Sequence, residues 1–179
     1  MDIARLSTVK ATNKLEAGLR YLELGVCLVP RHGVVAGFCT CGIDHCPHPG
    51  KHAINVPFSE RPTRDPSVVQ DWFRHWPQMN LGMFVGERWG VGVLDFDGPA
   101  AAGDYMRRNR IRIPQPHAVA LTGSGLGRRH LYYPFPVEVE LPGATVLGRG
   151  LLSRTPGMAQ YLTTNLPPNT GKKRRYTWL

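Results

Sequence analysis

The sequence predicts an α+β fold, because short β-prone runs and amphipathic helical segments follow one another in an irregular order. A regular alternation of strand and helix, which would indicate uniform βαβ winding, is not seen, so we expect a mixed sheet. The length of 179 residues is enough for one domain with a sizeable core and too short for two large ones.

The first segments predict a helix followed by a buried strand. In residues 13–24 leucines recur at helical spacing, with Thr12 or Asn13 as the cap and Gly25 as the end. The apolar run 26–30 then indicates a short buried strand.

A second helix is predicted over residues 66–76. Asp65 is suited to the N-cap, Pro66 to the first helical position, and Pro77 to the end, with apolar residues at three- and four-residue spacing between them. Further along the chain, the pattern predicts strands at 81–85, 91–97, 119–122, 130–133 and 159–164, and a helix at 99–110.

The chain carries no sign of a membrane or secreted protein. No apolar run approaches the roughly 18 to 20 residues of a membrane span, and the first residues show no secretory signal. We therefore expect a cytoplasmic protein without membrane association, in a compartment that keeps thiols reduced.

Cationic residues exceed anionic ones, for a net charge of +9, and they cluster at residues 107–112, 128–129 and 172–175. Each phosphate neutralised by Lys or Arg releases bound counterions, so a polyanion such as nucleic acid is a natural partner. The alternative is a charged surface that serves solubility alone.

Residues 31–64 are rich in Gly, Pro, His and Cys and show no periodicity, so this loop needs another source of order. A cluster of thiols and imidazoles within it indicates a tetrahedral zinc site in a reducing compartment. The ligands that we favour are Cys39, Cys41, Cys46 and His52. The spacing also allows His48 or His45 as the fourth ligand, and an unliganded surface loop is the alternative to the whole site.

The segment GVLDFDG places Asp95 and Asp97 two residues apart on a predicted strand. Side chains alternate between the faces of a strand, so both carboxylates are expected on one side. Mg²⁺ and Mn²⁺ prefer oxygen ligands and bind through one or two carboxylates plus substrate phosphates. An aspartate before glycine is also ordinary turn chemistry, which is the competing interpretation.

A glycine-rich turn in GSGLGRRHLYY precedes a predicted strand that carries Arg128, Arg129 and His130. Such a turn can bring backbone N–H groups close to a phosphate, and the arginines add positive charge. A hairpin with surface arginines and a half-buried histidine is the alternative.

Nearly end to end, the chain resembles the N-terminal domain of bifunctional DNA primase/polymerases, which belong to the archaeo-eukaryotic primase superfamily of plasmid, phage and mobile-element replication proteins. The stretches that carry the resemblance are GVCLVP after the first helix, the CxC…C…PGKH loop, RDPSVVQDWFRHWPQMNLGMFVG leading into GVGVLDFDG, and GSGLGRRHLYY followed by RRYTWL. The resemblance implies an αβ unit packed on an RRM-like sheet, in a single domain over 1–179 with a zinc-binding loop inserted at about 38–53.

The same resemblance implies nucleotidyl transfer from NTP or dNTP on a DNA template or primer, and association with a replicative helicase. Asp95 and Asp97 would then hold catalytic Mg²⁺ or Mn²⁺, and His130 would contact the incoming nucleotide. The zinc would be structural. Weaker candidates for binding the nucleotide phosphates are Ser124, Arg129 and Lys51.

One departure from the family pattern bears on activity. A third acidic metal ligand is expected in a Gly-hydrophobic-Asp-hydrophobic-Arg pattern, but GRGLLSRTPG places Leu152 or a neighbour there. Either Glu140 supplies the carboxylate from another element, or the metal that activates the attacking 3′-hydroxyl is bound weakly. The alternatives to an enzyme are therefore a catalytically inactive module that binds DNA or nucleotide, and a zinc-knot interaction protein unrelated to nucleotides.

Overall fold

The computed structural model of the protein describes residues 1–55, 62–96, 115–123, 128–135, 151–154 and 163–179. Its helical segments are η1 (Leu6–Thr8), α1 (Lys14–Glu23), α2 (Pro66–His75) and η3 (Glu87–Trp89). The strands are β1 (Leu28–Arg31), β2 (Val34–Val35), β3 (Phe38–Cys39), β4 (Asn80–Phe84), β5 (Val91–Phe96), β6 (Ala118–Leu121), β7 (Arg129–Pro134), β8 (Leu151–Arg154), β9 (Thr163–Asn165) and β10 (Thr177–Trp178).

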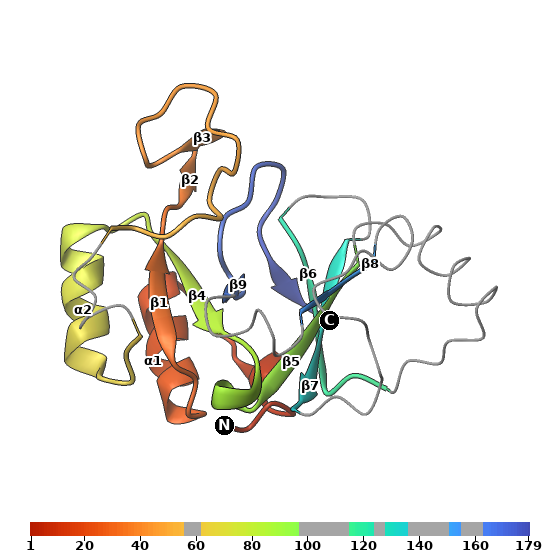
Figure 1. Ribbon diagram of the computed structural model, residues 1–179. Helices are drawn as coiled ribbons and strands as arrows, with labels where there is room; N and C mark the ends of the chain where they lie inside the picture. The colour runs from red at the N-terminus through yellow and green to blue at the C-terminus, as the bar shows by residue number, and fades with distance from the viewer. Residues whose placement is uncertain (56–61, 97–114, 124–127, 136–150, 155–162) are drawn as a thin grey trace.

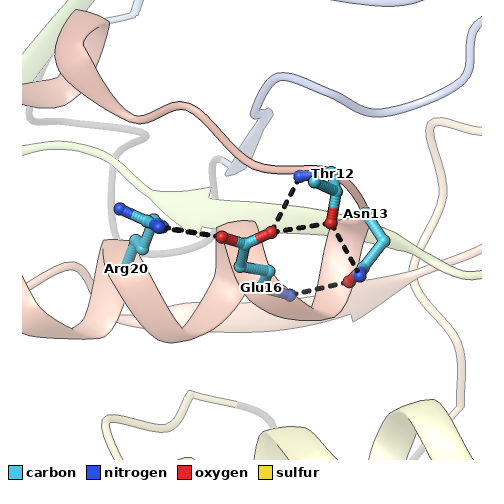
Figure 2. Close-up of polar contacts among 4 residues, drawn as sticks. All are labelled: Thr12, Asn13, Glu16 and Arg20. Atoms are coloured by element: carbon cyan, nitrogen blue, oxygen red, sulfur yellow. Dashed lines mark hydrogen bonds and ion pairs between the residues drawn. The ribbon is translucent and has the colours of Figure 1, made fainter.

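Helix α1 begins where side chains close its first turn (Figure 2). The Asn13 side chain accepts a hydrogen bond from the Glu16 backbone N–H at 2.9 Å, which makes Asn13 the N-cap. The Glu16 carboxylate in turn accepts from the backbone N–H and the hydroxyl of Thr12, each at 2.8 Å, and pairs with Arg20. Hydrogen bonds from the Thr12 backbone, from Arg20 and from the Thr12 hydroxyl lower the pKa of Glu16 to about 2.

Helix α2 confirms the prediction of a helix capped by Asp65. The Asp65 carboxylate accepts from the Ser67 backbone N–H at 2.8 Å. The two helices pack closely at Gly18, where a Cβ atom would lie 3.1 Å from Leu81 Cδ1 and 3.3 Å from Val69 Cγ1. This close approach lets α1 rest on both α2 and β4.

The strands form two sheets and a small hairpin (Figure 1). One sheet has the order β1-β4-β9, with α1 and α2 beside it, and the other has the order β10-β6-β7-β5-β8. The hairpin β2-β3 projects from the body at the top of Figure 1. Buried side chains from both sheets and from α1 and α2 join in one apolar core, which includes Tyr21, Trp72, Leu81, Val93 and Tyr132.

The expected mixed sheet is not found among the described strands, because every one of their pairings is antiparallel. Short connections are the physical reason for two of these pairings, β2-β3 and β6-β7, since parallel neighbours need a crossover of about a dozen residues or more. Strands β6 and β7, for example, are joined by residues 122–128 alone. The fold class, α+β, is confirmed.

The remaining predicted elements differ from the observed ones mainly where the sequence pattern is weakest. Strands β8 and β10 were not predicted, since one lies in a glycine-rich stretch and the other has only two residues. Of the strand expected at 159–164, residues 163 and 164 lie in β9 and 159–162 lie outside the described residues, as does the helix expected at 99–110. In the described part of the chain, no helix is long and apolar enough to cross a membrane.

Candidate functional site

Asp95 and His130 lie directly opposite each other on the neighbouring strands β5 and β7. His130 Nε2 is 3.6 Å from Asp95 Oδ1, and the two side chains, of His130 and Asp95, are only 10% and 14% exposed. A carboxylate and an imidazole are thus held together near the end of β5, in surroundings largely shielded from water. Such a pair can offer an oxygen ligand to a cation and a hydrogen-bonding ring nitrogen beside it.

The other ring nitrogen of His130 contacts Thr164 on β9, at 2.9 Å from the hydroxyl oxygen to Nδ1. Strand β9 belongs to the other sheet, so this buried contact joins the two sheets at the histidine. The Tyr132 and Tyr176 rings lie 6.3 and 6.1 Å from the imidazole, between ring centres. Sequence reasoning missed Thr164, because a threonine in a short strand carries no motif of its own.

The strand on the far side of Asp95 carries an apolar residue at the matching position. In the antiparallel pair β5-β8, Asp95 is the register partner of Leu152. Leu152 is one of the residues that the sequence analysis named at the place of the expected third acidic ligand, and the register puts it directly beside Asp95 in the sheet.

Several predicted site residues lie outside the described residues, namely Asp97, Ser124 and Glu140. Arg129 is half-buried on β7, and because it immediately precedes His130 in the strand, the two side chains project from opposite faces. Lys51 is exposed beside His52, and its backbone N–H donates to the His48 carbonyl at 3.1 Å. The structure therefore joins Asp95 with His130 but does not bring Arg129 to the face of His130.

The projecting hairpin β2-β3 and the loop after it, residues 34–52, form what we call the knuckle. Its four favoured ligands converge, with the ligand atoms of Cys39, Cys41, Cys46 and His52 all within 4.8 Å of one another. His52 Nε2 lies 3.3 Å from the Cys39 sulfur and 3.5 Å from the Cys46 sulfur. The alternative ligands His45 and His48 are exposed and are not part of this group.

The surroundings of Cys41 and His52 favour the forms of these side chains that bind metals, whereas those of Cys46 do not. A backbone hydrogen bond from Ile43 lowers the pKa of the Cys41 thiol, whereas desolvation raises the pKa of Cys46. The Gly50 backbone N–H points at the Cys39 sulfur at 3.5 Å, and desolvation lowers the pKa of His52, which favours the neutral imidazole that binds metals. Three thiols and one imidazole in this arrangement could hold a metal such as zinc.

The knuckle is joined to two strands of the β1-β4-β9 sheet through one carbonyl group. The Gly50 carbonyl accepts from the side-chain amides of Asn80 on β4, at 3.1 Å, and Asn165 on β9, at 2.8 Å. Both asparagines are buried, and Asn165 is the neighbour of Thr164. A continuous set of hydrogen bonds and adjacent residues therefore leads from the knuckle to His130.

Comparison with known proteins yields one family. The profile of the family described as "Prim-Pol: Bifunctional DNA primase/polymerase, N-terminal" matches residues 18–179. No curated protein matches the chain significantly, and no solved structure does so either. The matched segment runs from within α1 through β10 and includes both the knuckle and the Asp95–His130 pair.

Proposed function

Because the chain belongs to the family of bifunctional DNA primase/polymerase N-terminal domains, we propose that it is one prim-pol domain that transfers nucleotides from NTP or dNTP onto a DNA-templated strand. The observation that supports this most directly is the cross-strand pair of Asp95 and His130. A shielded carboxylate next to an imidazole is what binding of a metal-bound triphosphate requires.

In this proposal Asp95, together with Asp97 of the same motif, holds Mg²⁺ or Mn²⁺. Bound there, the cation would neutralise the triphosphate and stabilise the leaving pyrophosphate. His130, kept in place by Thr164, presents Nε2 toward the phosphates of the incoming nucleotide. Ser124, Arg129 and Lys51 are weaker candidates for binding the phosphates, and Arg129 is the less favoured because its side chain projects from the face opposite His130.

We further propose that the knuckle binds structural Zn²⁺ through Cys39, Cys41, Cys46 and His52. Four protein ligands fill a tetrahedral shell and leave no position for a substrate, so the metal would order the loop rather than react. A reducing cytoplasmic setting, in a replication protein of a mobile element with its helicase, would keep the three thiols available for the metal.

The pairing of Leu152 with Asp95 favours a second candidate function. With an apolar residue at the third acidic position, the site could bind nucleotide and DNA without turnover. The domain would then serve as a non-catalytic binding module of the same replication machinery.

Primer extension with Asp95→Asn tests the enzymatic proposal. The wild type, loaded with zinc, is expected to extend a labelled primer with Mg²⁺ or Mn²⁺, and Asp95→Asn should abolish the product because the cation loses its ligand. Asp71→Asn is the matched control, since Asp71 lies exposed on α2 and pairs with Arg74. Folded, zinc-loaded wild type that binds DNA but gives no product with either metal would instead establish the binding module.

A further inference from the structure

Lys14, the first residue of α1, occupies a groove whose lining includes Thr12, Phe73 and Arg175. Its ammonium group is half-buried and donates only to neutral oxygens, the Gln78 carbonyl at 3.2 Å and the Thr170 hydroxyl at 3.3 Å. Within the described residues, no carboxylate lies in ion-pair range of Lys14. A partly desolvated cation without a counter-charge is unfavourable unless an anion joins it.

A second cation makes the need for an anion stronger. Burial, together with the nearby Arg175, lowers the pKa of Lys14 to about 8. Two like charges thus face one groove, along with the polar groups of Thr12 and Thr170. An oxyanion placed between them would relieve the repulsion and accept hydrogen bonds from both cations.

Arg175 ends a tight turn that presents a row of cations. Residues Thr170 and Arg175 form an isolated bridge, and the Gly171 N–H donates to the Arg174 carbonyl at 2.9 Å. The exposed residues of this turn are Lys172, Lys173, Arg174 and Arg175. None of these four pairs with a carboxylate of the described chain, so their charge is available to a partner.

The turn is fixed against the segment that leads to His130. The backbone N–H groups of Lys173 and Arg174 donate to the Gly123 carbonyl at 3.2 and 3.4 Å. Gly171 packs on Gly123 so closely that a Cβ atom on Gly171 would lie 2.4 Å from the Gly123 Cα. The row of cations therefore starts at the glycine-rich connection before β7 and ends at the groove of Lys14.

The partner that matches this row is a chain of evenly spaced anions. A DNA strand supplies one phosphate per nucleotide, whereas an acidic protein segment would have to match the cations with long runs of Asp or Glu. The knuckle adjoins the same turn, because the Val34 N–H donates to the Thr170 hydroxyl at 3.1 Å. Phe38 on β3 of the knuckle is 78% exposed, and an exposed aromatic side chain can serve as a platform on which a base of a single strand stacks.

We propose that Lys14 and the basic turn 171–175 form a track that binds the phosphodiester backbone of a single DNA strand leading to the Asp95–His130 pair. That the bound strand leads to the Asp95–His130 pair rests on the proposed function, whereas binding of the strand to the track does not. Its residues are separate from the metal and nucleotide ligands proposed above.

Salt titrations of oligothymidylate binding, followed by fluorescence anisotropy, test the track. On single strands the slope of log K against log salt becomes shallower by about 0.7 for each phosphate that the protein no longer neutralises. We expect a decrease of about 1.4 for Lys172→Gln/Lys173→Gln and of about 0.7 for Lys14→Met, which keeps an apolar stem in the groove. Arg5→Gln/Arg88→Gln removes the same charge as the double variant from exposed residues outside the turn and should leave the slope nearly unchanged.

The proposed track would be wrong if the track variants and the Arg5/Arg88 control gave equal slopes while calorimetry showed every protein to be folded. It would also be wrong if the wild type did not bind the oligonucleotide. Asp95→Asn separates the two proposals, because it should keep the wild-type slope while losing primer extension. Salt-sensitive DNA binding without any extension product would contradict the proposed enzymatic activity and still support the track. Extension product from the wild type, together with unchanged salt slopes in the track variants, would support the enzymatic activity and contradict the track.

Discussion

Thr164 is the residue whose role is clearest from the structure and least visible in the sequence. Its hydroxyl holds Nδ1 of His130, and so leaves Nε2 as the nitrogen that faces Asp95. Partners of this kind orient an imidazole without touching the substrate, and losing them lowers function by roughly 10- to 100-fold in metal sites. Thr164 is therefore a positioning residue in the proposed site.

Replacing the hydroxyl with a methyl group tests this role. We expect Thr164→Val to lower kcat/KM for the nucleotide by roughly tenfold or more, since the imidazole loses its anchor, whereas Thr164→Ser should restore most of it. Nucleotide titrations in the primer-extension assay would measure both. Thr177→Val, at an exposed position of β10, is the control for exchanging threonine and valine in a strand. Wild-type kinetics in Thr164→Val would show that the contact is only structural.

Among the elements, the strand trio β7-β5-β8 determines what the site can do. The apolar runs of β5 and β7 predicted both strands, but which strand flanks β5 on its other side depends on long-range pairing, which no local pattern encodes. The register of β8 against β5 is therefore information that only the structure supplies. It identifies residue 152 as the position beside Asp95.

Leu152→Asp is expected to strengthen the metal site. A carboxylate at the register partner of Asp95 would share its face of the sheet and give the cation another oxygen ligand. We expect tighter Mn²⁺ binding by calorimetry and faster primer extension than the wild type. Leu151→Asp, at the register partner of Phe96 and not of Asp95, should give neither gain. Equal metal affinity in the two variants would mean that the third acidic position lies elsewhere.

The knuckle shows a different limit of sequence reasoning. Residue chemistry alone indicated all four favoured ligands, because thiols and imidazoles have few other reasons to cluster in a reducing compartment. The sequence favoured His52 but left His45 and His48 open, and the geometry is what separates His52 from them. What the ligand pattern could not indicate is how the knuckle is attached to the body, which depends on buried asparagines far away in the sequence.

At the scale of the whole molecule, we expect that attachment to couple the order of the knuckle to both the stability and the proposed activity of the chain. Removing one ligand with Cys46→Ser should reduce zinc content below one ion per chain and lower the Tm, because the loop loses its source of order. Primer extension should weaken as well, since the Gly50 carbonyl holds Asn165 next to Thr164. Elemental analysis, calorimetry and the extension assay measure the three effects.

The control for this variant is His48→Ala, which removes an exposed imidazole of the same loop that is not part of the four-residue group. It should keep its zinc, its Tm and its activity. Loss of zinc in His48→Ala but not in His52→Ala would reassign the fourth ligand.

The backbone at Gly50 limits which positions of the knuckle can be substituted. At the root of the loop, Gly50 has φ +71°, and a Cβ atom there would lie 2.8 Å from Val34 Cγ2 and 2.9 Å from the Thr170 carbonyl oxygen. At Gly37 and Gly42, by contrast, no described atom lies within 4 Å of an added Cβ. The tip therefore has room for side chains, at the backbone cost of φ +86° at Gly37 and +74° at Gly42, whereas the root has neither the room nor the backbone conformation for one.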